Sequence, residues 1–267
     1  MNWLARMAAR ALLAAGLMIA APALAAEAPQ KACDITVMIS GAFTPPYMVL
    51  APPFEKARGK TLCTVEGPSI GAIPSAIPNR LARGEDADVV IMVRASLDEM
   101  VAKGFVKSGS ETDLVRSRMG IAVKKRAPKP DISTSDKFRQ ALLDAKAVVY
   151  SISASGVYMT TEVFPKLGIA EQMKKKSRQI PGTPVALELV AGRADLGIQQ
   201  ISELQAIDGA EVVGPIPAPW QRITLFSAGV VAKSRHPAEA AALIKHLTEA
   251  GSWPTIRNAG LEPAAAP

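Results

Sequence analysis

Apolar runs of strand length alternate with segments of helical spacing over residues 35–93. The runs ITVMIS, LCTVEGPS and ADVVIMV are mostly apolar, and each has the length of a strand. Between them, YMVLAPPFEKARG and GAIPSAIPNRLARG carry apolar residues at helical spacing and end at Gly59 and Gly84. Continuous apolar strands that alternate with helices predict a parallel sheet covered on both faces.

The same order returns over residues 147–200. AVVYSIS, SRQI and ADLGIQQ are strand-like, and GVYMTTEVFPKLGI and TPVALELVAG are helical, with stops near Gly168 and at Gly192. The closing phrases LARGEDADVVIMV and LVAGRADLGIQQ share a helix end, a Gly stop, Ala-Asp and a buried strand. Their spacing of about 110 residues is too long for a solenoid and favours two related α/β lobes.

Two further strand-like segments, residues 117–125 and 222–233, follow polar stretches between and after these halves. Each is placed to carry the chain from one half to the other. We therefore predict an α/β fold of two lobes, each a mostly parallel sheet flanked by helices, hinged by two crossover strands. The first lobe is expected to comprise residues 26–113 plus 234–267, and the second residues 114–233.

The first 25 residues have the pattern of a cleaved signal peptide. Arg6 and Arg10 precede an apolar run, residues 11–21, and the segment ends in Ala-Leu-Ala. This run is too short to span a bilayer, although a membrane anchor is the alternative for such a segment. We expect cleavage after Ala25 or Ala26, export to the periplasm and no membrane insertion of the mature chain.

The charge pattern bears on the class of partner. Removing the signal segment, which holds two Arg and no acid, lowers the net charge from +7 to +5. Basic clusters at residues 124–126 and 174–176 lie where elements are expected to end, so solvated termini explain them. Aromatic residues make up 4% of the chain, too few for platforms that stack bases. We therefore expect no nucleic-acid partner.

Two cysteines, Cys33 and Cys63, both lie in predicted strands near the mature N-terminus. In an oxidising compartment such a pair favours a structural disulfide, with two free thiols as the alternative. A metal site or a thiol catalyst would require further ligands or a nearby His. His236 and His246 both lie far away, in the C-terminal helical region, so we expect no metal site.

Four loops follow the carboxyl ends of predicted strands, where ligands of open α/β sheets bind. Small or polar uncharged residues dominate these loops, which are residues 40–43, 67–71, 151–156 and 199–202. Three lead into a predicted helix, whose first N–H groups and dipole attract an anion, and Ser hydroxyls add donors. Ser and Gly at helix starts also act as N-caps, which is the structural alternative for each loop alone. Together the loops predict a cleft for a small anionic ligand.

The order of motifs resembles the type II periplasmic solute-binding proteins, and within them the molybdate-binding branch. The similar segments span nearly the whole mature chain: ITVMISGAF, FEKARG, GPSIGAIPSAI, RLARGEDADVVIMV, SASGVY, LVAGRADLGI and VVGPIP. The resemblance implies a monomeric two-lobe ligand trap without a cofactor, which closes by a hinge and delivers its solute to the permease of an ABC importer.

The oxyanion contacts of this branch can be carried over one position at a time. They fall on Ala42, Ser69, Ser155 with Gly156 and Tyr158, Val185 and Gln200. Ala42 and Gln200 stand where the branch has Ser and Tyr, so two hydroxyl donors are missing. A buried site that loses donors binds an oxyanion poorly, which favours a carboxylate ligand over molybdate. Ser40, Gly41 and Arg94 complete the expected ligand-binding set, with a surface position as the alternative for Arg94.

PNRLARGEDADVVIMV and SASGVY also resemble a sub-branch that includes a periplasmic aconitate isomerase. That resemblance implies a cofactor-independent 1,3-allylic proton shift between cis- and trans-aconitate, which needs a base and donors for the developing charge. Tyr158, Tyr47 and Glu203 are candidate bases, with packing or a first-turn acid as their alternative roles. No His lies near any of the serine loops in the sequence, which disfavours a hydrolase. We expect a solute-binding protein for an organic acid, with the isomerase as the alternative.

Overall fold

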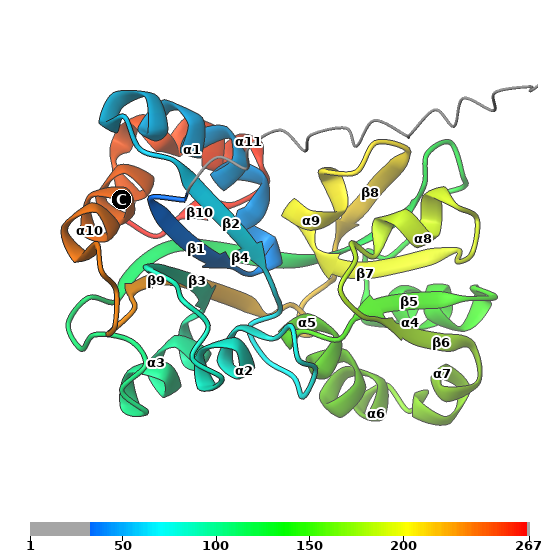
Figure 1. The fold of residues 1–267 in the computed structure, drawn as a ribbon. Coiled ribbons are helices and arrows are strands. Elements are labelled where there is room, and N and C mark those ends of the chain that lie inside the picture. Colours follow the sequence, from blue (N-terminus) through cyan, green and yellow to red (C-terminus); the bar gives the residue numbers. More distant parts are fainter. Residues whose placement is uncertain (1–32, 266–267) are drawn as a thin grey trace, which may run out of the picture. The chain divides into compact units, whose positions relative to one another are not determined.

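One long strand, β4 (Thr112–Lys124), takes part in two groups of strands (Figure 1). Its first part pairs with β9 (Ile223–Val230) and β10 (Glu262–Pro263), and its second part with β7 (Leu196–Gln200) and β8 (Ala210–Pro215). The strand order is β2-β1-β3-β9-β4-β7-β5-β6. The computed structural model describes residues 33–265, so the expected signal peptide lies outside the described residues.

The first group of strands contains a parallel trio at one edge of the sheet. Strand β1 (Ile35–Ile39) pairs in parallel with β2 (Leu62–Glu66) and β3 (Val89–Val93), and β9 runs antiparallel to β3. The helical elements around this group are η1 (Gly41–Phe43), α1 (Thr44–Arg58), α2 (Ile77–Ala82), α3 (Arg94–Ala102), α10 (Pro237–Thr248), η3 (Ala250–Ser252) and α11 (Trp253–Asn258).

The second group repeats the parallel trio. Strand β5 (Val148–Ser151) pairs in parallel with β6 (Ser177–Ile180) and β7, and β4 runs antiparallel to β7. Its helical elements are α4 (Ser135–Asp144), α5 (Ala154–Tyr158), the π-helical segment η2 (Met159–Val163), α6 (Phe164–Lys166), α7 (Ala170–Lys176), α8 (Ala186–Val190) and α9 (Ile201–Gln205). The predicted α/β class with mostly parallel sheets is therefore confirmed.

Alternate residues of the central strands enter separate cores, as period-two side-chain geometry requires. Val37, Ile39 and Ile91 pack with residues of α1, α10 and α11, which lie on one side of the first sheet in Figure 1. Met38 and Met92 pack with residues of α2 and α3 on the other side. Coverage of both faces explains why these strands read as continuous apolar runs.

The helix expected over residues 71–84 is shorter than its apolar spacing indicated. The chain forms bends and turns up to Ser75, and helix α2 begins at Ile77 with Pro78 in its first turn. Proline disfavours helical geometry at the residue before it but fits the first turn, so Pro74 and Pro78 together delay the start of the helix. The loop at residues 67–71 therefore does not open a helix directly.

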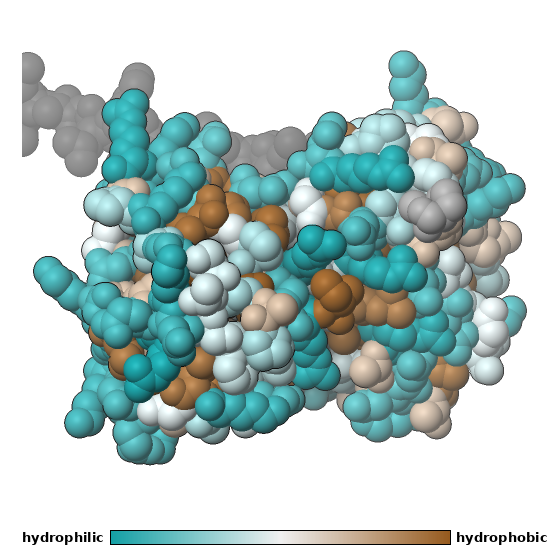
Figure 2. Space-filling model, turned by 180° about the vertical axis from the view of Figure 1, so that it is seen from behind, coloured by the Kyte–Doolittle hydropathy of each residue, from teal (hydrophilic) through white to brown (hydrophobic). Residues whose placement is uncertain are grey.

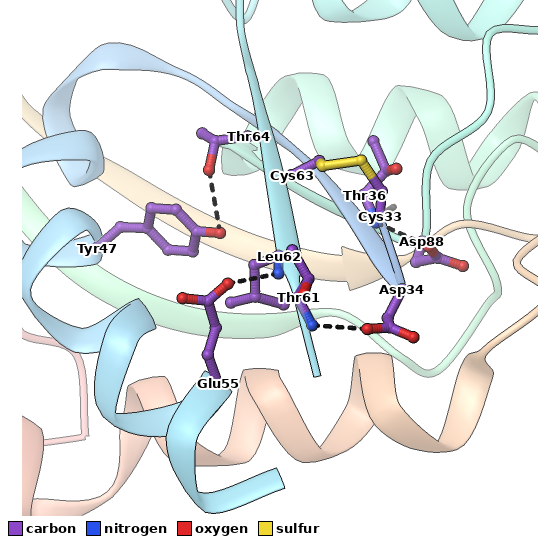
Figure 3. Close-up of a disulfide and its surroundings, with 10 residues drawn as sticks. All are labelled: Cys33, Asp34, Thr36, Tyr47, Glu55, Thr61, Leu62, Cys63, Thr64 and Asp88. Carbon is purple, nitrogen blue, oxygen red and sulfur yellow. Dashed lines mark hydrogen bonds between the residues drawn. A yellow bond between two sulfur atoms is a disulfide. The ribbon is translucent and has the colours of Figure 1, made fainter. Parts of the chain in front are cut away.

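The predicted disulfide joins Cys33, just before β1, to Cys63 in β2 (Figure 3). The two Cα atoms are 5.5 Å apart across neighbouring parallel strands. Beside it, the Asp34 carboxylate accepts a hydrogen bond from the Thr61 N–H at 2.8 Å. The disulfide therefore links the residues just before β1 to the edge strand β2, next to the parallel pairing of these two strands.

Figure 2 shows one face of the molecule as mainly hydrophilic, with separate small hydrophobic areas. Over the described residues, the large hydrophobic side chains that are exposed are Met48, Val49, Leu187 and Ile223. Scattered apolar residues of this kind are ordinary on a protein surface. Within residues 33–265, no helix has the length and apolar character that a membrane span requires.

Candidate functional site

A cavity of about 370 Å³ lies at the carboxyl ends of strands from both groups. All four loops predicted from the sequence contribute to its wall: Ser40 and Gly41 after β1, Gly67 and Pro68 after β2, Ser151 to Ser155 after β5, and Gln199 and Gln200 at the end of β7. Thr44, Glu66, Thr183 and Glu203 add further polar side chains. The carboxyl ends of parallel strands thus form a shared site, as open α/β sheets do.

The charge of the cavity wall is unusual for an anion site. Of the described residues that line it, none is Lys, Arg or His, and the acidic ones are Glu66 and Glu203. Neutral donors must therefore bind any anionic ligand: hydroxyl groups of Ser and Thr, side-chain amides and backbone N–H groups. An anion in this cavity would therefore be held by hydrogen bonds and not by ion pairs with basic side chains.

The serines at the two helix starts do not act as side-chain caps. Ser40 precedes η1 and Ser153 precedes α5, and neither side chain makes a capping hydrogen bond. Within the second loop, the Ser151 and Ser155 hydroxyls are 3.0 Å apart, and the Ser153 N–H donates to Ser151 Oγ at 3.3 Å. The N-cap alternative for these loops thus does not account for Ser40 and Ser153.

Gly156 packs the start of α5 against β5. A Cβ at this position would overlap the carbonyl oxygen of Ser151 and lie 3.1 Å from the Tyr150 ring. Because only hydrogen fits there, the helix start approaches the strand end closely. Gly156 therefore shapes the loop that carries Ser153 and Ser155 without lining the cavity itself.

Glu203, in the first turn of α9, is the carboxyl group with the most perturbed environment in the cavity. Burial raises its pKa to about 8, and the negative charge of Glu66 acts in the same direction, whereas a hydrogen bond from Gln199 lowers it. That hydrogen bond runs from Gln199 Nε2 to Glu203 Oε1 at 2.6 Å. A carboxyl with a pKa near neutrality, placed in a cavity, is suited to give and take protons.

Gln199 connects Glu203 to the start of α8. Its Oε1 accepts a hydrogen bond from the backbone N–H of Val185 at 3.0 Å. The Val185 N–H, which the resemblance placed among the ligand contacts, is thus bonded to a side chain of the protein itself. Val185 lies behind the cavity wall rather than in it, next to the lining residue Pro184.

Several other predicted residues are placed away from the cavity. Ser69 is fully buried, and its Oγ accepts from the Val93 N–H at 3.0 Å. Arg94 forms ion pairs with Asp98 and Asp113, at 2.7 and 2.8 Å, and is not among the lining residues. Both residues therefore support the local structure of the first group of strands.

The aromatic candidates for a base are also held elsewhere. The Tyr158 hydroxyl donates to the carbonyl of Trp220 at 3.2 Å, and the Arg222 guanidinium lies over the Tyr158 ring. Tyr47 is fully buried in the first core, where its hydroxyl lies 3.4 Å from Thr64 Oγ1 (Figure 3). Burial raises the Tyr47 pKa further above its ordinary value, which makes it a poor base.

The two positions that lost a hydroxyl relative to the molybdate-binding branch differ in their roles. Ala42 is fully buried beside the cavity and does not line it. Gln200 lines the cavity, while its Oε1 accepts from Ser117 Oγ at 2.7 Å and its Nε2 donates to Thr224 Oγ1 at 3.2 Å. Gln200 thereby links β7, β4 and β9 at the point where the chain passes between the two groups of strands.

Thr44 and Glu66 line the cavity and were not identified from the sequence, whereas Gln199 was predicted only as part of the loop at residues 199–202. Thr44 Oγ1 is buried and has no hydrogen-bond partner within the described residues, so it is a free donor and acceptor at the start of α1. Glu66 is the last residue of β2 and Gln199 the second-last of β7. Polar residues at strand ends were the available signal, because each interrupts an otherwise apolar run.

Comparison with known proteins identifies the family. Residues 35–262 match the sequence model of a protein family that is described as bacterial extracellular solute-binding protein. A Pseudomonas sp. protein named aconitate isomerase is 44% identical over 254 residues, which cover 95% of this chain and 96% of that protein.

Two solved structures show the fold. The periplasmic molybdate-binding protein of Azotobacter vinelandii aligns with a TM-score of 0.69 at 16% identity, over 85% of this chain and 98% of that one. The sulfate-binding protein SubI of Mycobacterium tuberculosis aligns with a TM-score of 0.67 at 21% identity, over 86% and 87%. The fold is that of the type II periplasmic binding proteins, and the chain belongs to the family of bacterial extracellular solute-binding proteins.

Proposed function

We propose that this protein is an isomerase of the aconitate type, which moves a proton along a three-carbon unit of an unsaturated tricarboxylate. The observation that carries the proposal is Glu203, a carboxyl group whose pKa is raised to about 8 in a cavity of neutral hydrogen-bond donors. The 44% identity to a protein named aconitate isomerase supports the same reaction.

The proposed chemistry needs one base and no change in oxidation state. Glu203, in its ionised form, removes a proton from the CH₂ group of aconitate, which lies next to a carboxylate and to the double bond. The electron pair of the broken C–H bond spreads over the allylic carbons and the attached carboxylate. The same proton, or one exchanged from water, then bonds to the far allylic carbon while the double bond moves, so that atoms and charge balance.

A raised pKa serves both halves of this reaction. An ionised carboxyl with a pKa near 8 is a stronger base than an ordinary glutamate, and its protonated form is still acidic enough to return the proton. Among the candidate bases, Glu203 alone combines a place in the cavity wall with such an environment. Tyr47 and Tyr158 are held in hydrogen bonds elsewhere.

The neutral donors suit a charge that develops on the substrate. Preorganised N–H and O–H groups stabilise an oxyanion best where water is excluded and the donors need not reorient. The hydroxyl groups of Ser40, Thr44 and Ser153 lie in the wall and make no capping or other side-chain hydrogen bond within residues 33–265. We assign them to the substrate carboxylates, with the starts of α1 and α5 as further donors.

Capture of an organic acid for an ABC importer is the second candidate function. The family and the type II periplasmic binding fold favour it, because proteins of this fold named for molybdate and sulfate binding align over most of the chain. In either case the N-terminal segment supports a periplasmic location. Both candidates use the same cavity, and they differ in whether Glu203 transfers a proton.

Turnover separates the two candidates. Purified mature protein is incubated with trans-aconitate or cis-aconitate, and the isomers are followed by chromatography or proton NMR. Interconversion in both directions to one equilibrium ratio supports the isomerase. Thermal stabilisation by aconitate, citrate or malonate without any conversion would support capture instead, since a bound ligand stabilises by RT ln(1 + [L]/Kd).

A further inference from the structure

We infer that Gln199 is a positioning residue: it fixes the Glu203 carboxyl so that Oε2 is the oxygen that carries the transferred proton. This inference rests on the proposed function, because it assigns the atom through which the proposed base acts. It follows from the two hydrogen bonds of Gln199 and from the space at Gly41.

The orientation of the Gln199 amide is set by its backbone partner. A backbone N–H can only donate, so the Gln199 atom 3.0 Å from the Val185 nitrogen must be the carbonyl oxygen Oε1. The amide nitrogen Nε2 therefore faces Glu203, and donates to Oε1 at 2.6 Å. Gln199 is 4% exposed, so water does not compete for either bond.

The hydrogen bond from Gln199 determines where a proton on Glu203 can sit. Nε2 of a side-chain amide donates and does not accept, so Glu203 Oε1 stays an acceptor whether the carboxyl is ionised or protonated. A proton on Oε1 would face the hydrogens of Nε2. Protonation therefore takes place on Oε2.

Gly41 provides the space for this arrangement. A Cβ at residue 41 would overlap Glu203 Oε1 and would lie 3.2 Å from Oε2. Oε1 thus occupies the place of a missing side chain, between Gly41 and Gln199, and is shielded on both sides. Oε2 is the less enclosed oxygen of the pair and the one left for a substrate.

A single proton-bearing oxygen has a consequence for the reaction. Oε2 takes the proton from one allylic carbon and holds it while the electron pair shifts. The same atom then delivers the proton to the other allylic carbon on the same face of the substrate. Glu66, at the end of β2, is the other acidic group of the cavity wall within the described residues, and its charge opposes ionisation of Glu203.

The test measures the titration of Glu203 in two variants of Gln199. Gln199→Leu removes both hydrogen bonds, and Gln199→Glu keeps an acceptor for the Val185 N–H but loses the donor to Glu203. Gln199→Leu should raise the Glu203 pKa by about one unit, and Gln199→Glu, which adds a second carboxyl beside Glu203, should raise it further. In each variant the rise of kcat/KM with pH, which reports ionisation of the free enzyme's base, should move to higher pH by the same amount as that variant's Glu203 pKa.

A matched control exists on the surface. Gln140 donates to Asp144 at 2.7 Å with the same four-residue spacing, on the exposed face of α4. Gln140→Glu should leave both the kcat/KM profile and the Glu203 titration unchanged. A merely structural role for Gln199 would lower activity in its variants without moving the pH profile.

Direct observation of Glu203 keeps this inference separable from the proposed function. Carbon-13 NMR of glutamate carboxyls, with Glu203→Gln to assign the signal, reports the Glu203 titration without any turnover. An unmoved titration in both Gln199 variants would overturn the inference. If the wild-type protein does not turn over aconitate, the proposed function fails, and the titration still decides whether Gln199 sets the ionisation of Glu203.

Discussion

The carboxyl of Glu203 occupies the space that a side chain at Gly41 would fill. The two residues come from different groups of strands: Gly41 begins η1 after β1, and Glu203 lies in the first turn of α9 after β7. A Cβ at residue 41 would overlap Glu203 Oε1. The position of the proposed base therefore depends on a glycine about 160 residues earlier in the chain, in a loop that the sequence predicts to bind an anion.

Gly41→Ala should displace the Glu203 carboxyl and lower the isomerisation rate by roughly 10- to 100-fold, because a misplacement near 1 Å has effects of this size. The backbone at Gly41 has no positive φ, so alanine adds volume without backbone strain. Steady-state rates with trans-aconitate measure the effect. Gly251→Ala is the matched control, since a Cβ there meets no atom within 4 Å. Equal rates for both variants would contradict the assigned contact.

The raised pKa of Glu203 predicts a dependence of stability on pH. An acid with a folded-state pKa of about 8 stays protonated in the native state while the unfolded chain, with a pKa near 4.5, ionises. The free energy of unfolding therefore decreases as the pH rises from about 4.5 to 8. Glu203→Gln removes this ionisable group. The free energy of unfolding of the variant should therefore exceed that of the wild type by about 1–3 kcal/mol at pH 8 and by little at pH 4.

Urea unfolding of both proteins at pH 4 and pH 8 measures this difference. Glu171→Gln is the control, because Glu171 is an exposed acid whose pKa is lowered by the hydrogen bond from Lys174. Its contribution has the opposite sign, so this variant should show no gain at pH 8. If Glu203→Gln changes the free energy of unfolding equally at both pH values, Glu203 has an ordinary pKa in the folded protein.

Replacing both Cys33 and Cys63 with Ser should lower the free energy of unfolding by about 2–4 kcal/mol. The disulfide closes a loop between residues separated by 30 positions, and cross-links of this size restrict the unfolded chain. Urea unfolding of the oxidised wild type and of the double variant measures the loss. Reduced wild-type protein should match the variant. Because the bond lies at the far end of β1 from the cavity, ligand binding should be retained at low urea.

Ser153→Asp should have opposite effects on the empty protein and on ligand binding. Asp is a good N-cap, and Ser153 at the start of α5 makes no capping bond, so the empty fold should be unchanged or slightly more stable. The added carboxylate would lie in the proposed anion site, so stabilisation by aconitate should be lost. Thermal shift with and without ligand measures both effects.

Thr134→Asp provides the control for that substitution. Thr134 caps α4 through a hydrogen bond from the Lys137 N–H and does not line the cavity. This variant should keep the full ligand-induced shift. Retained ligand stabilisation in Ser153→Asp would remove the start of α5 from the proposed site.

Much of the fold was predictable because its local signals agree with its packing. The apolar runs of β1 and β3 are continuous since both faces of the sheet are covered, and Gly59 ends α1 in the left-handed conformation, with φ of 62°. The loops at strand ends meet in one cavity because parallel strands share a carboxyl edge. The late start of α2 was missed, because apolar spacing does not register the effect of Pro74 and Pro78.

The chemistry of the site was less accessible from the sequence. Glu203 looks like an ordinary first-turn acid until the folded chain surrounds it with Gly41, Gln199 and Glu66, which come from three other elements. Conversely, Arg94 directly follows the end of a strand, where ligand-binding residues are expected. In the folded chain, however, it forms ion pairs with Asp98 and Asp113. Pairings across the fold decide both roles, and no local pattern encodes them.

Comparison of Glu203→Gln with the wild type tests the central claim most directly. Both proteins, and Glu171→Gln as an exposed Glu-to-Gln control, are assayed for binding and for interconversion of trans- and cis-aconitate. We predict that Glu203→Gln binds aconitate but loses about 10²- to 10⁴-fold in kcat, while Glu171→Gln keeps wild-type rates. Full turnover by Glu203→Gln would contradict the account.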